Sequence, residues 1–592
     1  MNIKRGLLML TLSEFNILTQ LLNKTTHTQR MLAEQTRMSL GKVNILLKKL
    51  KDENLITENL TLTKSGLQSL EPFAVNNAII LAAGMSTRFA PLSYEKPKGL
   101  LKVKGELLIE RQIEQLKAVG IKDIILVVGY MKEKMFYLEE KYGVKIVVNE
   151  EYYKYNNTSS LMLVKDLLAN TYICSSDNYF VKNPFERYVY RSYYSAVYED
   201  GETNEYCIQC DKKGKITNVE IGGENSWTML GHVFFNKSFS EKFVDILEKE
   251  YPRQVTKNGL WEDLYIRYVS ELDMYIRHYD KEQIQEFDSL DELREFDSNY
   301  LSNSNSEILK NICNVLNCNE HDIKKIEPIK SGMTNTSFKF SVDNKNYVYR
   351  HPGRGTDSYI SRASEAQSMQ VAKCLGIDDT YIYIDKDKGW KISYFIENAR
   401  TLDYNNKNDV EMALNYLKKL HKSGYKTDYT FDIWKQIDNF KHILAENKRD
   451  DFEDMHILVG IVEKLKSVLN NKEICLCHCD SYDPNFLIDN DEKMYLIDWE
   501  YSGMADPAVD LGTFIACSSY TIDEAKQIIK QYLGEKFNKN YEKHYLGYTA
   551  VISFYWFLWA LHQESVGKNV GNYLYIWYKY VKLYGKEALL TN

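Results

Sequence analysis

The stretch NNAIILAAGMSTRFAPLSYEKPKGLL, residues 76–101, decides the fold of the central part of this chain. It begins as an apolar strand and runs into a loop of small residues. Residues 107–119 then show helical periodicity, and IKDIILVVGY (121–130) is a second apolar strand. Strands that are apolar on both faces and joined by a helix predict a parallel sheet covered by helices on both sides. We expect this α/β domain to occupy residues 74–297.

The remainder of the 592-residue chain predicts two further domains, one on either side of the central one. Residues 1–73 predict short helices, including one over 39–53, followed by a small hairpin at residues 55–63. Residues 298–592 open with alternating strands and close with helices, which predicts two lobes. The Ser- and Asn-rich residues 298–306 predict a linker. The expected fold class is therefore multidomain α/β.

Composition excludes several classes of protein. Hydrophobic residues make up 44% and charged residues 27% of the chain, which is typical of soluble folded proteins rather than disordered or fibrous ones. The net charge of -7 argues against a chain that coats nucleic acid or an anionic membrane. The longest apolar stretch, residues 550–561, is too short to span a bilayer, and the first residues lack the cleavage site of a signal peptide. We expect a cytoplasmic protein with no membrane partner and with reduced cysteines.

The N-terminal region is locally basic. Ten basic and six acidic residues give residues 1–73 a charge of +4. The order of helices and hairpin resembles a winged helix-turn-helix domain with the helix at 39–53 in the recognition position. The resemblance implies that phosphate contacts could come from Lys42, Lys48, Lys49 and Lys51. A solvated basic face on a domain kept for dimerisation or docking explains the same pattern, so DNA binding stays open.

Cys475, Cys477 and Cys479 alternate around His478, a composition that metal sites also show. In a strand, this alternation places the three cysteines on one face and His478 on the other. The pattern therefore favours a buried strand over a metal site.

A loop of small residues between a buried strand and a helix lets backbone N–H groups approach phosphates, and a nearby basic side chain adds charge for the transition state. Residues 81–84, Arg88, Pro91 and Lys98 supply these parts. The string LAAGMSTRFAPL (81–92), followed by Pro-Lys at 97–98, resembles the nucleotidyltransferases with a nucleotide-diphospho-sugar transferase fold. Among them, it is most similar to the bacterial CTP:phosphocholine cytidylyltransferases. The likeness continues through VVNEEYYKYNNTSSL (147–161), CSSDNYF (174–180), TNEY (203–206) and WEDLYIRYVSELDMY (261–275).

This resemblance implies transfer of CMP from CTP to phosphocholine with release of pyrophosphate. Because two anions meet in that reaction, Mg²⁺ held by carboxylates is expected. The resemblance assigns the metal to Asp177 and to Glu262 or its neighbour Asp263, and the catalytic cations that hold the phosphates are Arg88 and Lys98. Nucleotide contacts are expected from Leu81, Ala82, Ala83, Gly84, Asn156 and Ser160. Tyr206 is either a wall for the trimethylammonium group or an ordinary half-buried strand tyrosine.

The sharpest motif in the chain is HCDSYDPNFLIDNDEKMYLIDWEYSG, residues 478–503. A kinase uses one carboxylate to accept a hydroxyl proton, and an amide oxygen and a second carboxylate to hold Mg²⁺. Asp480, Asn485 and Asp498 have that order and spacing. The pattern predicts phosphoryl transfer from ATP, with Asp480 as the catalytic residue and Asn485 and Asp498 as metal ligands.

Upstream, SGMTNTSFKF (331–340) predicts a strand-turn-strand that covers ATP phosphates, and YVYRHPGRGT (347–356) is the next strand. Together with the motif at 478–503, these stretches resemble the choline kinase and aminoglycoside phosphotransferase group of kinase-like folds, and bacterial choline kinases in particular. The resemblance implies a bilobal domain in which Arg350 binds phosphate and pairs with Glu365. Further nucleotide contacts are expected from Thr334 and Asn335, and support for the catalytic loop from Asp506 and Asp510.

Aromatic residues indicate the alcohol that this domain phosphorylates. In SFYWFLWALHQE (553–564), two tryptophans lie three residues apart on one helical face, which matches the WxxW of the choline kinases. A quaternary ammonium group cannot donate a hydrogen bond, so proteins hold it with π-faces. The expected substrate-binding residues are Tyr501, Trp556, Trp559, Tyr573 and Tyr575. An apolar core helix is the alternative explanation for this spacing.

The two resemblances converge on one metabolite. We predict a bifunctional enzyme that makes phosphocholine from choline and ATP and then CDP-choline from phosphocholine and CTP, with Mg²⁺ in both sites. One alternative keeps both folds but takes ethanolamine or another amino alcohol. Another is a metabolite-sensing regulator that binds DNA. Oligomeric state, including a homo-oligomer, and transfer of the intermediate between sites stay open.

Overall fold

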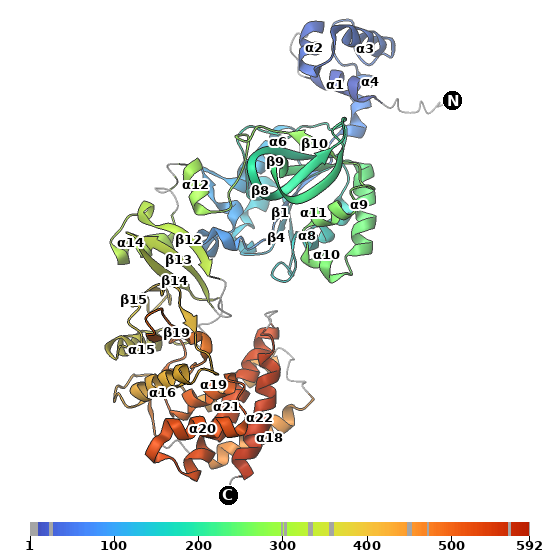
Figure 1. Cartoon of the computed structure of the whole chain (residues 1–592). Helices are drawn as coiled ribbons and strands as arrows, with labels where there is room; N and C mark the ends of the chain where they lie inside the picture. The colour runs from blue at the N-terminus through green and yellow to red at the C-terminus, as the bar shows by residue number, and fades with distance from the viewer. Residues whose placement is uncertain are drawn as a thin grey trace. The chain divides into compact units, whose positions relative to one another are not determined.

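The computed structural model describes residues 10–22, 28–297, 300, 305–329, 335–353, 360–446, 453–469, 473–565 and 570–590. The chain divides into two compact units, Met1–Ser306 and Glu307–Asn592, which Figure 1 shows with all their elements. The boundary lies a few residues beyond the predicted one at 297. Most of the predicted linker is outside the described residues. The predicted division at residue 73 stays a prediction, because the first unit includes both the N-terminal region and the α/β part.

The N-terminal region of the first unit is helical. Its helices are α1 (Leu12–Gln20), α2 (Gln29–Thr36), α3 (Leu40–Asp52) and α4 (Lys64–Leu70). Each follows a Ser or Thr whose side chain accepts a backbone N–H of the first turn, which is the usual N-cap. Between α3 and α4, the expected hairpin is reduced to an isolated bridge between Ile56 and Leu62. The winged helix therefore remains a prediction.

Two of the four lysines expected to contact phosphate are paired with carboxylates of the same region. The Lys49 Nζ lies 2.5 Å from Glu14 Oε1, and the Lys51 Nζ lies 2.7 Å from Glu58 Oε2. Glu14 is buried, so Lys49 is needed to compensate its charge. This leaves Lys42 and Lys48 as the lysines of α3 for which the described residues show no ion pair.

The α/β part of the first unit is built on a seven-stranded sheet with the order β10-β8-β9-β6-β1-β4-β5. β1 (Asn77–Ala82) is parallel to β4 and β6, and β4 is parallel to β5. The other strands are β4 (Ile124–Val128), β5 (Lys145–Val148), β6 (Thr171–Ser175), β8 (Tyr193–Cys210), β9 (Ile216–Phe235) and β10 (Tyr275–His278). The expected parallel arrangement around β1 is confirmed, and β8 and β9 extend it with a long antiparallel hairpin.

Helices cover both faces of this sheet, as its apolar strands require. Ala78 and Ile80 of β1 pack on α6 and α7, whereas Ile79 points to the other face and packs on α8, α9 and α11. These helices are α6 (Leu108–Ala118), α7 (Tyr137–Tyr142), α8 (Asn157–Leu163), α9 (Lys237–Glu250) and α11 (Trp261–Arg267). A small antiparallel pair, β7 (Asn178–Phe180) with β11 (Ile284–Glu286), continues from the end of β6.

The second unit has a strand-rich part and a helical part, as predicted. Its five-stranded antiparallel sheet has the order β12-β13-β14-β16-β15. The strands are β12 (Lys324–Ile329), β13 (Thr336–Val342), β14 (Lys345–His351), β15 (Tyr381–Ile384) and β16 (Lys391–Tyr394), and the helices α14 (Glu307–Leu316) and α15 (Arg362–Cys374) accompany them. Short strands of the motif region follow, namely β17 (Arg400–Thr401), β18 (Cys475–Cys477), β19 (Phe486–Ile488), β20 (Met494–Leu496) and β21 (Gly503–Ala505).

Most of the remaining residues of the second unit form helices. They are α16 (Lys407–His421), α17 (Ile433–Glu446), α18 (Met455–Val468), α19 (Ala508–Cys517), α20 (Ile522–Leu533), α21 (Lys539–Ser565) and α22 (Tyr573–Leu590). Figure 1 shows α21 beside α22, and their aromatic residues share one core. Among the helices that the structure describes, none is both long and apolar enough to cross a membrane.

We expect glycine-to-alanine substitutions at two helical positions of the second unit to have opposite effects. A Cβ on Gly512 of α19 would lie 3.3 Å from backbone atoms of Tyr548 and Thr549 in α21, whereas a Cβ on Gly460 of α18 meets nothing within 4 Å. Gly512→Ala should lower the free energy of unfolding by about 1–3 kcal/mol. Gly460→Ala should raise it by about 0.5–1 kcal/mol. Thermal unfolding of the full chain measures both; equal shifts would contradict the close approach of α19 to α21.

Candidate active sites

The first unit contains a cavity of about 670 Å³ at the carboxyl end of β1. The loop that follows β1 forms one wall, and the residues around the start of α8 form another. Predicted residues that line the cavity are Leu81, Ala82, Ala83, Gly84, Lys98, Asn156, Ser160 and Asp177. The structure thus brings together the expected nucleotide contacts, one of the two catalytic cations and the first expected metal ligand.

A buried ion pair lies at the base of this cavity. The Lys98 Nζ donates to Asp177 Oδ2 at 2.9 Å, and the two side chains are 8% and 18% exposed. Burial by itself raises the pKa of the Asp177 carboxyl, but the Lys98 ammonium overcomes this and lowers the pKa below its usual value. The other oxygen, Asp177 Oδ1, is buried and has no hydrogen-bond partner in the described part of the chain.

The carboxylate that interacts with Asp177 is Glu286, which sequence reasoning missed. Glu286 ends β11, and its Oε2 accepts a hydrogen bond from Asn178 Nδ2 at 3.0 Å. Burial, and after it the charge of Asp177, raises the pKa of Glu286 to about 7. The charges of Glu286 and Asp288 also act on Lys98. The signal in the sequence was a pair of acidic residues, Glu286 and Asp288, at the end of a short strand. No local pattern linked this pair to Asp177.

The expected metal ligands Glu262 and Asp263 lie among tyrosines. Glu262 Oε1 accepts from the Tyr194 hydroxyl at 3.2 Å, and Asp263 Oδ1 accepts from the Tyr206 hydroxyl at 2.8 Å. Burial raises the pKa of Glu262 to about 7. The described residues show no direct contact between either carboxylate and Asp177, so the predicted ligand set stays a prediction. Each carboxylate is instead hydrogen-bonded to one phenol, and Tyr206 is one of the two.

Arg88 lies at the edge of the site. Its side chain is 77% exposed and pairs with Asp288 at 3.2 Å. It does not line the cavity as Lys98 does. A side chain this exposed can move toward a bound phosphate, but the structure itself places it beside Asp288.

The second unit contains a cavity of about 560 Å³. Predicted residues that line it are Asn335, Arg350, Asp480, Asn485, Asp498, Tyr501, Trp556, Trp559 and Tyr573. Thr334 lies outside the described residues. Expected phosphate, metal and alcohol contacts therefore share one cavity, although they come from segments more than 200 residues apart in the sequence.

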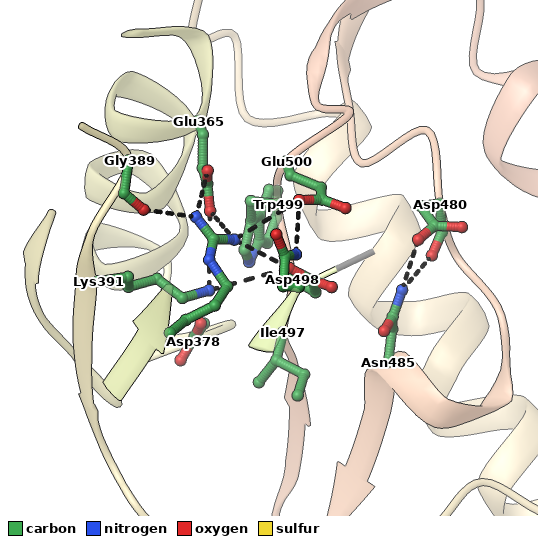
Figure 2. Close-up of polar contacts among 12 residues, drawn as sticks. Glu365, Asp378, Gly389, Lys391, Asp480, Asn485, Ile497, Asp498, Trp499 and Glu500 are labelled. Atoms are coloured by element: carbon green, nitrogen blue, oxygen red, sulfur yellow. Dashed lines mark hydrogen bonds and ion pairs between the residues drawn. The ribbon is translucent and has the colours of Figure 1, made fainter. Parts of the chain in front are cut away.

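A buried guanidinium organises one side of this cavity. Arg350 of β14 donates to Glu365 of α15 at 2.7 Å and to Asp498 at 3.1 Å, so the expected Arg350–Glu365 pair is present. Lys391 of β16, which no sequence signal marked, lies 3.7 Å from Glu365 and 4.0 Å from Asp498. Glu500 is the fourth charge nearby, at 3.8 Å from Arg350. In Figure 2, Asp498 lies between Glu365 and Asp480.

Asp480 and Asn485 form the other side of the cavity in the second unit. The Asn485 amide donates to the Asp480 backbone oxygen at 2.8 Å and to Asp480 Oδ2 at 2.9 Å, as Figure 2 shows. These bonds fix the carboxylate and leave the amide oxygen of Asn485 for another partner. Burial, together with the charges of Asp498 and Glu500, raises the pKa of Asp480 well above its usual value.

The loop that carries Asp480 is held from behind by Asp510 of α19. Asp510 Oδ2 accepts from the His478 N–H at 2.9 Å, and Oδ1 accepts from the Cys479 N–H at 2.6 Å. Cys479 adopts a left-handed φ of 66°, a conformation that such backbone bonds can stabilise. The expected bracing role of Asp510 is seen directly. Asp506 contacts His544 of α21 instead.

An aromatic wall completes the cavity. The ring centroids of Trp556 and Trp559 lie 5.6 Å apart, and the ring centroid of Tyr501 lies 5.5 Å from that of Trp556. Tyr573 stacks on Trp577 at 5.1 Å, and both line the cavity. Tyr575, which was expected to bind substrate, does not line it and is 67% exposed. Because Tyr573 and Trp577 are four residues apart in α22, they share a face that the intervening Tyr575 does not. Helical spacing could have identified Trp577.

These folds and sites define a nucleotidyltransferase joined in one chain to a kinase-like phosphotransferase. Residues 78–199 match the MobA-like NTP transferase domain, and residues 325–546 match the phosphotransferase enzyme family. The chain is 39% identical over 234 residues to choline-phosphate cytidylyltransferase of Streptococcus pneumoniae (strain ATCC BAA-255 / R6), covering 40% of this chain and 98% of the relative. The chain thus belongs to the cytidylyltransferase family that includes this relative.

Other matches include a second cytidylyltransferase and a solved choline kinase structure. Over 229 residues the chain is 35% identical to 2-aminoethylphosphonate cytidylyltransferase of Lancefieldella rimae, covering 38% of this chain and 93% of the relative. The solved structure of choline kinase LicA from Streptococcus pneumoniae is 25% identical, with a TM-score of 0.42, and the match covers 47% of this chain and 98% of that one.

We expect Gly129→Ala to weaken CTP binding. A Cβ at Gly129 would lie 2.7 Å from Tyr152 Cβ and 2.9 Å from the backbone oxygen of Ala83, and both residues line the cavity. The clash must move the nucleotide loop or the facing wall, so we expect the Kd for CTP, measured calorimetrically, to rise about tenfold, which corresponds to about 1.4 kcal/mol. Gly41→Ala, which meets nothing within 4 Å in the N-terminal region, is the matched control. Unchanged affinity in Gly129→Ala would show that this contact does not shape the site.

Proposed function

We propose that the chain makes CDP-choline in two steps. The second unit phosphorylates choline with ATP, and the first unit transfers CMP from CTP to the resulting phosphocholine. The observation that carries this proposal is the aromatic wall in the same cavity as the Asp480–Asn485 pair. It offers π-faces to a quaternary ammonium group beside a carboxylate that can accept a hydroxyl proton. The similarity of the first unit to choline-phosphate cytidylyltransferase supports the same metabolite.

In the kinase step, Asp480 accepts the choline hydroxyl proton while the hydroxyl oxygen attacks the γ-phosphorus of ATP. The bond from that phosphorus to the β,γ-bridging oxygen breaks, and ADP leaves. Asn485 holds the Asp480 carboxylate in position for this transfer. Arg350 and Lys391 supply positive charge on the opposite side, where the phosphates are expected. Asp498 and the free amide oxygen of Asn485 form the carboxylate and carbonyl donor set that suits Mg²⁺.

In the transfer step, the phosphocholine phosphate attacks the α-phosphorus of CTP, and pyrophosphate leaves. Backbone N–H groups around Gly84 and the Lys98 ammonium stabilise the phosphate charge, and Arg88 assists from the edge. We assign Mg²⁺ here to Asp177, whose Oδ1 lacks a partner, with Glu286 as the second carboxylate. When bound, Mg²⁺ supplies positive charge against the phosphate oxygens in both sites. Glu262 and Tyr206 then contact the trimethylammonium group.

A second candidate replaces choline by a primary amine substrate. The similarity to 2-aminoethylphosphonate cytidylyltransferase favours it for the first unit. A primary ammonium group needs hydrogen-bond acceptors, which Glu262 and Asp263 could provide. The indole and phenol rings of the second unit favour the quaternary group instead.

The two-step proposal is tested by a phosphorus NMR time course of the full chain with Mg²⁺, ATP, CTP and choline, repeated with ethanolamine. We expect phosphocholine to appear first and CDP-choline with pyrophosphate to follow. Asp480→Asn should slow the first step by at least about a hundredfold and leave the conversion of supplied phosphocholine intact. Asp177→Asn should do the reverse. Faster turnover of ethanolamine would favour the second candidate, and the absence of both products would reject the proposal.

The two groups of carboxylates in the first unit are distinguished by a pair of matched substitutions. We expect Glu286→Gln to raise the Mg²⁺ concentration for half-maximal transfer about tenfold with little change in the KM for phosphocholine. Glu262→Gln should raise that KM about tenfold with little change in the Mg²⁺ requirement, because a charge beside the ammonium group is lost. Steady-state kinetics of the transfer step measure both. The opposite result would support Glu262 as the metal ligand, as the sequence predicts, and reject Glu286.

A further inference from the structure

Three metal-ligating side chains meet behind the catalytic loop of the second unit, outside both proposed active sites. Cys475 and Cys477 come from β18, and His421 is the last residue of α16. One ligand atom from each side chain lies within 4.8 Å of the other two. The sequence around Cys475 favoured a plain buried strand because His478 points away from the cysteines. The structure brings a different histidine, 54 positions upstream of Cys475, to the cysteine face.

The two sulfurs already have the separation that a tetrahedral metal requires. Cys475 Sγ and Cys477 Sγ lie 3.7 Å apart, since alternate residues of a strand project from the same face. Two thiolates bound to one tetrahedral zinc at about 2.3 Å each are about 3.8 Å apart. No change of the strand is needed for both to bind one ion.

The histidine has the support that metal-bound histidines usually have. His421 Nε2 contacts Asp510 Oδ2 at 2.8 Å, an arrangement in which a carboxylate fixes the ring and leaves the other nitrogen for the metal. That nitrogen, Nδ1, faces the Tyr532 hydroxyl at 2.6 Å. Burial raises the pKa of Tyr532, and the charges of Cys477 and Cys475 add to this effect. An ion bound at Nδ1 would displace the hydrogen bond from Tyr532.

Ligand type and access indicate which ion would bind. Two thiolates and an imidazole select zinc and similar soft cations over Mg²⁺, which prefers oxygen ligands. Cys477 is fully buried, but Cys475 is partly exposed and gives the ion a route from the surface.

We propose that Cys475, Cys477 and His421 form a binding site for one zinc-class cation. The site is connected to the kinase centre through Asp510. The Asp510 carboxylate contacts His421 and accepts hydrogen bonds from the backbone N–H groups of His478 and Cys479. These two residues belong to the loop that carries Asp480. A bound ion would therefore hold His421 and Asp510 in place and so stabilise the loop that carries Asp480.

Cobalt titration of the full chain in excess Mg²⁺ tests the site independently of activity. Co²⁺ bound by thiolates shows a charge-transfer band that oxygen-bound Co²⁺ lacks. We expect this band to saturate at one Co²⁺ per chain, to disappear on addition of zinc and to be lost in Cys475→Ser. Cys374→Ser, which removes an exposed cysteine of α15 in the same unit, should retain it. Absence of the band in the wild-type chain, or its persistence in Cys475→Ser, would overturn the proposal.

A measurement on the unmodified chain covers the case in which Cys475→Ser fails to fold. Cysteines are alkylated with and without zinc, and the modified residues are identified by mass spectrometry. We expect zinc to slow alkylation of Cys475 at least about tenfold and to leave Cys374 unaffected. Equal alkylation of Cys475 under both conditions would contradict the site.

Discussion

The second unit depends on the compensation of one buried charge. The Arg350 guanidinium is 4% exposed, and such a charge is costly in a protein interior unless carboxylates surround it. Glu365 comes from a helix, and Asp498 and Glu500 come from the segment after β20. Because each must reach the same guanidinium, β14, α15 and this segment fix one another. The position of Arg350 on the side of the cavity opposite Asp480 follows from this constraint.

The first unit repeats the principle on a smaller scale. Lys98 and Asp177 neutralise each other at the end of the parallel sheet, where the loop after β1 lines the cavity. Glu286 adds a second carboxylate, and burial together with the charge of Asp177 raises its pKa to about 7. A surplus of buried negative charge beside an unpartnered oxygen is the electrostatic condition that a divalent cation relieves. Both units thus combine fixed cations with buried carboxylates.

Prediction from sequence succeeded where the signal lies within one element or one continuous motif. The strand and loop of residues 76–101, the helix predicted at 107–119, the motif at 478–503 and the Arg350–Glu365 pair are all present. Prediction was less successful for contacts between residues on separate helices or strands. Glu286 is 109 positions from Asp177 in the sequence, and only the pairing of β11 with β7 makes them neighbours. Tyr575 was chosen as an aromatic residue near Tyr573, but the pitch of α22 turns it outward.

The sequence by itself determined the two catalytic classes, because their motifs place loop backbone, carboxylates and amide in fixed local order. It also determined the α/β character of the first unit, since the apolar strands must be covered on both faces. The tertiary structure alone decided which carboxylate joins Asp177, which ring of α22 enters the cavity, and that His421 meets Cys475 and Cys477. The physical reason is that periodicity specifies which residues share a face, whereas contact between two faces depends on how separate elements pack.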